Sequence, residues 1–132
     1  MIIKAHFILY VSDQKRSTDF YSSVLLIEPV LNVPGMTEFA IGDATLGLMP
    51  ADGIARLLGR AITHPSPAGN TPRSEVYLMV DNPADYHSRS MMSGARELSP
   101  LTPRDWGHTA AYSQDPDGYI LAFASQLPHF IA

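Results

Sequence analysis

The segment TPRDWGHTA carries the side chains best suited to binding a ligand. Trp106 is the only tryptophan of the chain, and it stands between Arg104-Asp105 and Gly107-His108. An indole at the mouth of a cleft can stack on a planar molecule, and a neighbouring guanidinium can pair with an anion. The same residues would equally suit a cap over the end of the core, with Arg104 and Asp105 in water. The sequence leaves both interpretations open.

Cysteine and histidine content limits the remaining chemistry. The chain has no cysteine, which excludes disulfides, thiol nucleophiles and thiolate metal ligands. Of its five histidines, His6 lies in an apolar strand and His108 begins another. His64, His87 and His129 fall in a linker, a helix and the tail, where we expect exposure to solvent.

Two similar halves would position these residues. Residues 5–25 predict a strand followed by a helix, with Ser12 or Asp13 as its N-cap. Residues 74–95 repeat the order, with a strand at 75–80 and a helix that Pro83 opens. Each half continues with three short strands: 29–33, 38–41 and 45–49 in the first, and 97–101, 108–113 and 119–124 in the second. The pattern βαβββ therefore occurs twice.

The halves are expected to pack as one α+β domain over residues 1–132. Module one covers about 1–50 and module two about 74–126, because neither can cover both faces of its small sheet alone. The linker, about 51–73, opens with a possible short helix at 54–58 and is then rich in Pro, Gly and Asn. In module two, Asp115-Pro116-Asp117-Gly118 predicts a tight turn in which Asp115 bonds the backbone two residues on.

The stretches HFILYVSD and STDFYSSVL near the start, with WGHTAAYSQDPDGYILAFA near the end, resemble the vicinal oxygen chelate superfamily, the glyoxalase/bleomycin-resistance/extradiol-dioxygenase fold. The resemblance covers essentially the whole chain. It implies eight strands forming one curved, partly open sheet around a cleft, helices outside, and a homodimer in many members. The fold is shared by lyases, dioxygenases and drug-binding proteins, so it specifies no reaction. The family usually has glycine at Leu26, so we expect the first helix to end without a left-handed glycine.

By this resemblance, metal-dependent members place ligands at four equivalent points, which fall here on His6, Gly47, Glu75 and Ala122. Only His6 and Glu75 carry a donor side chain. Two ligands would hold a divalent ion only weakly, so we expect no metal cofactor and no lactoylglutathione lyase activity. His6 and Glu75 could instead form a catalytic pair without metal, with the carboxylate orienting the imidazole.

Side chains alternate along a strand, so steps of two from these points give the expected lining of the cleft. We expect the loss of bulk at Gly47 and Ala122 to leave space at its floor, whereas the alternative is a barrel filled by its own side chains. The predicted ligand contacts are Tyr10, Met49, Tyr77, Met79, Arg104, Trp106 and His108.

Composition limits the partners. The chain has 132 residues, of which 45% are hydrophobic and 17% charged, as in globular domains. A net charge of −4 without a basic block gives little support for nucleic-acid binding. No apolar run is long enough for a membrane span. We therefore expect a cytoplasmic protein whose partner is a small molecule.

These observations favour a metal-independent small-molecule-binding protein. The alternative is a glyoxalase- or dioxygenase-like enzyme with an atypical site built on His6 and Glu75. A third hypothesis, of a different class, is a regulatory or structural dimeric module with a filled cleft.

Overall fold

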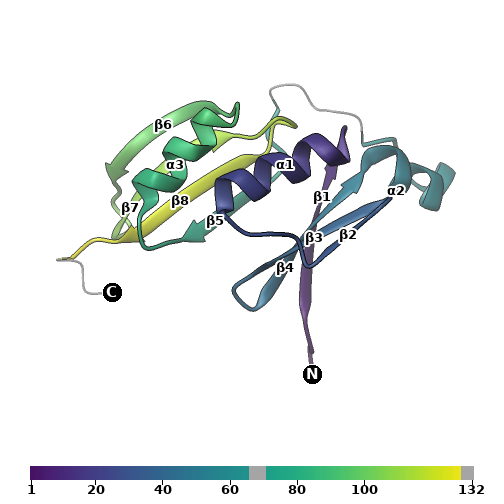
Figure 1. The fold of residues 1–132 in the computed structure, drawn as a ribbon, viewed down its shortest axis with the longest axis horizontal. Helices are drawn as coiled ribbons and strands as arrows, with labels where there is room; N and C mark the ends of the chain where they lie inside the picture. The colour runs from purple at the N-terminus through teal and green to yellow at the C-terminus, as the bar shows by residue number, and fades with distance from the viewer. Residues whose placement is uncertain (66–70, 129–132) are drawn as a thin grey trace. The chain divides into compact units, whose positions relative to one another are not determined.

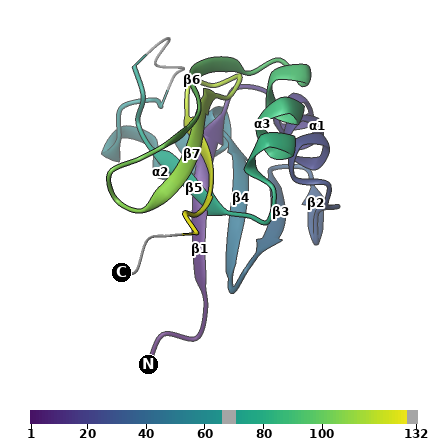
Figure 2. The ribbon, with the colours of Figure 1, turned by 90° about the vertical axis from the view of Figure 1, so that its left-hand side faces the viewer.

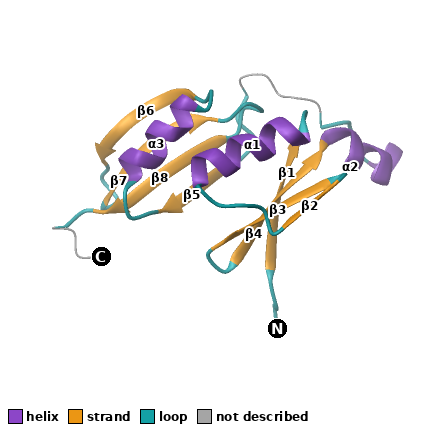
Figure 3. Cartoon of the chain, viewed as in Figure 1, coloured by secondary structure: helices purple, strands orange, loops and turns teal. Residues whose placement is uncertain are grey.

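The computed structural model describes residues 1–65 and 71–128, and the chain divides into two compact units, residues 1–67 and 68–132 (Figure 1). The middle of the predicted linker, 66–70, and His129 lie outside the described residues. Within the described ranges the eight strands form two open four-stranded sheets, one in each unit. The predicted α+β class and the twofold βαβββ order are confirmed, as the alternation of helices and strands in Figure 3 shows.

The first unit contains β1 (Ala5–Val11), α1 (Gln14–Leu25), β2 (Leu31–Val33), β3 (Met36–Ile41) and β4 (Ala44–Pro50). A helix α2 (Ala51–Leu58) and a 3-10 turn η1 (Gly59–Ala61) follow, so the predicted short helix begins three residues earlier than expected. The strand order is β1-β4-β3-β2, in which β1 pairs with β4 in parallel and the other pairs are antiparallel.

The second unit repeats this plan with β5 (Glu75–Met79), α3 (Pro83–Met92), β6 (Arg96–Pro103), β7 (His108–Gln114) and β8 (Ile120–Gln126). The strand order is β5-β8-β7-β6, with β5 and β8 parallel. Helix α3 packs against β6, β7 and β8 on one face of this sheet (Figure 2). Helix α3 does not cover the opposite face of this sheet.

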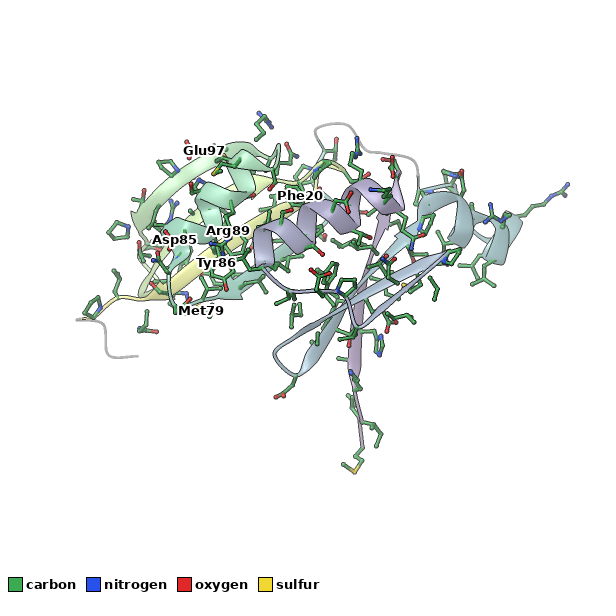
Figure 4. All side chains as sticks on the ribbon, viewed as in Figure 1. Phe20, Met79, Asp85, Tyr86, Arg89 and Glu97 are labelled. Carbon is green, nitrogen blue, oxygen red and sulfur yellow. The ribbon has the colours of Figure 1, made fainter. Side chains whose placement is uncertain are left out.

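Apolar alternation builds the core of the first unit between its sheet and α1. The buried side chains are Leu9, Val11, Phe39, Leu46 and Leu48 from the strands and Phe20, Tyr21, Val24 and Leu25 from the helix. In the second unit Tyr86 of α3 packs against Phe123 of β8, with ring centroids 5.2 Å apart. Arg89, one turn further along α3, lies over the Tyr86 ring at 4.3 Å (Figure 4).

Local signals in the sequence account for the helix ends and the second turn. Asp13 caps α1 by accepting from the Arg16 N–H at 3.0 Å, and Pro83 stands at the first turn of α3. Asp115 accepts from the Asp117 N–H at 2.9 Å, as predicted for this turn. Helix α1 ends without a glycine, but Leu26 itself adopts the left-handed conformation, with φ 56° and ψ 41°.

The prediction that His87 is exposed is wrong. Its side chain is buried, with 8% of the residue exposed, and Nε2 lies 2.8 Å from Glu97 Oε2. A carboxylate partner on β6 lets the imidazole occupy a buried position on α3, a contact that helical periodicity does not reveal. No helix in the described ranges has the length and apolarity needed to cross a membrane.

Candidate ligand-binding site

The face of the second sheet opposite α3 holds several of the predicted ligand contacts. Tyr77 of β5 and Tyr112 of β7 flank Ala122 of β8, because both are paired with it across the ladders. His108 shares this face because it lies four residues before Tyr112 on the same strand. Met79 lies two residues beyond Tyr77 and is half exposed. We call this surface the Tyr77 face.

Three predicted residues meet in one hydrogen-bonded group, the aromatic cluster of Tyr77, Trp106 and His108. The Trp106 indole N–H donates to Tyr77 Oη at 3.0 Å. Tyr77 Oη in turn lies 2.7 Å from His108 Nδ1, and the two rings have centroids 5.8 Å apart. Trp106 remains 48% exposed, so its indole is held at its polar edge and open to solvent elsewhere.

The turn between β6 and β7 places Trp106 at this position. It closes through the Arg104 N–H, which donates to the His108 carbonyl at 2.7 Å. Gly107 has φ +92°, a conformation that a glycine adopts without strain. The Gly107 carbonyl accepts from the Leu127 N–H at 2.9 Å and the Gln126 side chain at 3.2 Å, which ties the turn to the end of β8.

Arg104 is directed into its own hairpin. Its Nη2 donates to Ser99 Oγ at 2.8 Å and to the Ala110 carbonyl at 2.9 Å. The guanidinium carbon also lies 5.2 Å from the centroid of the Tyr112 ring. These contacts stabilise the β6–β7 hairpin, and direct ligand contact by Arg104 stays a prediction.

The pKa of Tyr112 is shifted by the surroundings of the Tyr77 face. Burial raises the pKa of the Tyr112 phenol above its usual value, and the charge of Glu75 and the neighbouring Tyr77 add to the rise. The Arg104 charge opposes it. The negative charge of Glu75 therefore affects groups on this face, although Glu75 is exposed at the first position of β5.

The first unit gives His6 a carboxylate neighbour that sequence reasoning missed. His6 Nδ1 lies 3.5 Å from Glu38 Oε2. Gly47 is paired with Ile8 of β1 on one side and with Glu38 of β3 on the other. The alternation of Glu38 with buried Thr37 and Phe39 was the available signal. Glu75 belongs to the second unit, and its pairing with His6 stays a prediction.

The expected space at Gly47 is absent, and that prediction is wrong. A Cβ at this position would lie 3.0 Å from Ile8 Cγ1 and 3.3 Å from Met36 Sδ. The side chains of Ile8 and Met36 therefore lie against the position that a Cβ would take. Tyr10 and Met49, the other predicted contacts of this unit, are paired across β1 and β4 and are half-buried.

A cavity of about 580 Å³ in the first unit lies at the start of α1 and beside the β2–β3 turn. Sequence reasoning did not single it out. Gln14 bridges it by donating to the Val33 carbonyl at 2.8 Å and to Thr37 Oγ1 at 3.0 Å. Thr18 Oγ1 and Thr37 Oγ1 are 2.8 Å apart. This polar network ties the hairpin to the helix.

Candidate metal ligands were compared across the described ranges. No group of three or more His, Asp or Glu side chains there could hold an ion together. His6 and Glu38 supply two donors, one fewer than a catalytic zinc site takes from the protein. Independence from metal stays a prediction.

Comparison with known proteins identifies the fold. The sequence profile of the Glyoxalase/Bleomycin resistance protein/Dioxygenase superfamily matches residues 4–123. No curated protein matches the chain significantly in sequence.

Solved structures agree with that profile. A glyoxalase/bleomycin resistance protein/dioxygenase from Nocardioides is 20% identical with a TM-score of 0.76, over 98% of this chain and 87% of that one. A glyoxalase-related enzyme from Fulvimarina pelagi is 23% identical with a TM-score of 0.78, over 92% and 86%. A family enzyme from Burkholderia phytofirmans PsJN is 14% identical with a TM-score of 0.80, over 93% and 98%. These identities show the fold alone, whereas the profile covers most of the sequence: the chain belongs to the glyoxalase/bleomycin resistance protein/dioxygenase superfamily.

Proposed function

We propose that the chain is a metal-independent small-molecule-binding protein whose planar ligand stacks on Trp106 at the Tyr77 face. The aromatic cluster carries this proposal. Its indole is half exposed, yet the bond to Tyr77 Oη fixes the ring. A contact surface that is already ordered loses little side-chain entropy when a ligand binds. Tryptophan and tyrosine also supply large apolar areas with few rotatable bonds.

Two features support binding without metal. Gly47 and Ala122 carry no donor atoms at the positions where the family resemblance places metal ligands. Ala122 also lies between Tyr77 and Tyr112, so aromatic rings rather than carboxylates border it. The Tyr77 face is thus suited to an apolar planar molecule with few polar groups, as in most ligand pockets.

Intrinsic fluorescence tests the proposal, because the single tryptophan reports on the cluster alone. A panel of planar aromatic compounds is titrated with and without EDTA, and hits are confirmed by calorimetry. We expect chelator-independent binding, weakened by more than about 1 kcal/mol in Trp106→Ala. Tyr112→Phe, which keeps the neighbouring ring, is the matched control. A Trp106→Ala variant that loses several kcal/mol of stability but keeps its affinity would assign Trp106 to the core, and EDTA-sensitive binding would refute metal independence.

We further propose a cytoplasmic homodimer. Strand β1 is an edge strand of its sheet, and Phe7 on it is 64% exposed. Exposed apolar edges favour association between copies. Sedimentation velocity at micromolar concentration should show a species of twice the 14.4 kDa chain mass, and a monomer alone would reject the dimer.

A further inference from the structure

The hydrogen bonds of the aromatic cluster limit where its protons can lie. An indole N–H can only donate, so Tyr77 Oη accepts from Trp106. Tyr77 has one proton of its own, and His108 Nδ1, at 2.7 Å, is the other partner of its hydroxyl within the described ranges. The Tyr77 O–H can donate to Nδ1, and this direction requires the tautomer in which Nδ1 carries no proton. A neutral imidazole that accepts at Nδ1 carries its proton on Nε2.

In this tautomer Nε2 of His108 is the free donor of the ring. It has no hydrogen-bond partner among the residues that the structure describes. Nδ1 of His87 is the one side-chain nitrogen or oxygen that is completely buried without a partner among those residues, so Nε2 of His108 is not completely buried. With this tautomer, the cluster would present an N–H donor beside a half-exposed indole.

We propose that His108 Nε2–H is the specificity-determining donor of this site and selects planar aromatic ligands that carry a neutral carbonyl oxygen. This inference rests on the proposed function and names the ligand class for the same site. The indole supplies the stacking surface, and Tyr77 positions His108 by holding its tautomer. A ligand without an acceptor would leave the donor unpaired on binding, which weakens it relative to a carbonyl analogue.

Charge on the Tyr77 face favours a neutral carbonyl over a carboxylate. Glu75 contributes negative charge to this face, and Asp105 adjoins Trp106 in the sequence. The Arg104 Nη2 is bonded to Ser99 and Ala110 in the hairpin. The negative charge of Glu75 therefore disfavours an anionic ligand on this face, and the hydrogen-bond donors of Arg104 Nη2 already have partners in the hairpin.

The tautomer can be read directly by two-bond ¹H–¹⁵N NMR of the histidine rings near neutral pH. We expect His108 as the Nε2–H form in the wild type and a mixture of tautomers in Tyr77→Phe. Tyr112→Phe, on the same face but outside the cluster, should leave the tautomer unchanged. A wild-type Nδ1–H form, or no change in Tyr77→Phe, would overturn the positioning role of Tyr77.

Ligand choice is tested with three probes of one ring system: 2-acetylnaphthalene, 2-ethylnaphthalene and 2-naphthoate. The single Trp106 indole N–H signal follows each titration. We expect 2-acetylnaphthalene to bind about three- to tenfold more tightly than 2-ethylnaphthalene, and this preference to disappear in His108→Phe. Tyr77→Phe, read the same way, should reduce the preference if His108→Phe fails to fold.

The outcomes separate the two proposals. If no probe binds, the proposed function fails and the ligand class with it. If acetyl- and ethylnaphthalene bind equally, or if the preference survives in both variants, the proposed function stands and the role of His108 is refuted. If 2-naphthoate binds best, the site selects anions and the neutral-carbonyl assignment is wrong.

Discussion

Replacing Gly47 by alanine should destabilise the chain, and removing the Ile8 side chain should reverse the sign of that effect. An added Cβ would lie 3.0 Å from Ile8 Cγ1, which is tighter than ordinary van der Waals contact and requires Ile8 to move by a few tenths of an ångström. Overpacking of this kind costs about 1–3 kcal/mol. Ile8 is 41% exposed and can yield in part, so we expect the lower end of that range.

The loss of conformational freedom in the unfolded chain partly offsets the cost of the clash. Where the backbone conformation suits alanine, Gly→Ala stabilises by about 0.4–1 kcal/mol, because the unfolded chain loses freedom. Gly47 lies inside β4 and is not among the residues with positive φ, so this gain applies. We expect Gly47→Ala to lower the free energy of unfolding by about 0.5 kcal/mol in the wild type, and to raise it by about 0.5 kcal/mol in the Ile8→Ala background.

Chemical denaturation of the four proteins of the double-mutant cycle measures both values and their coupling. Gly53→Ala in α2 is the matched control: its Cβ would lie 3.6 Å from Met49 Cε, an ordinary contact. We expect it to stabilise by about 0.5–1 kcal/mol, equally with and without the Ile8 side chain. A stabilising Gly47→Ala in the wild type, or the same value in both backgrounds, would refute the close packing. A glutamate at this position requires the same displacement of Ile8, so restoring a family carboxylate is obstructed.

Four further outcomes are expected. Leu26→Gly should raise the free energy of unfolding by about 0.5–1 kcal/mol in chemical denaturation. An L-residue in the left-handed conformation costs about 1–2 kcal/mol, and Leu26 buries only a third of its surface. Ser23→Gly, at an exposed position within the same helix, should lower the free energy of unfolding in the same assay. Glu97→Ala should lower stability by about 1 kcal/mol by removing the acceptor of buried His87, and an unchanged midpoint would show that water replaces the carboxylate. Burial raises the pKa of Tyr112, so above pH of about 10 the unfolded chain releases this proton first and the free energy of unfolding falls as the pH rises further. In a series of denaturation experiments at increasing pH, Tyr112→Phe should show a smaller fall in this range. The same pH dependence in the wild type and the variant would contradict this prediction. Elemental analysis of protein purified without added metal should find no stoichiometric Zn, Ni, Mn or Fe, whereas about one tightly bound ion per chain would show that a further ligand completes the site.

The local elements of this protein are determined by signals within a few residues of each other. Alternating apolar residues predict the strands, and Asp13 and Pro83 mark the helix starts because their backbone and side-chain preferences act locally. The turn at Asp115 follows for the same reason. Trp106, Tyr77 and His108 could also be chosen as candidates, since unusual residue types and strand parity are visible in the sequence.

Which of these side chains meet was decided by tertiary structure. Trp106 and His108 reach Tyr77 across about thirty residues, because the β5-β8-β7 register brings distant strands together. Strand pairing likewise gave His6 a partner in Glu38, a residue that no spacing rule connects to it.

Packing density is the second property that the sequence could not supply. A glycine in a strand predicts missing bulk, but only the positions of Ile8 and Met36 show that neighbours fill the space at Gly47. The hydrogen bonds of Arg104 within the β6–β7 hairpin likewise could not be predicted from its residue type. Residue type fixes what a side chain can bond, whereas the partner it bonds depends on contacts between segments far apart in the chain.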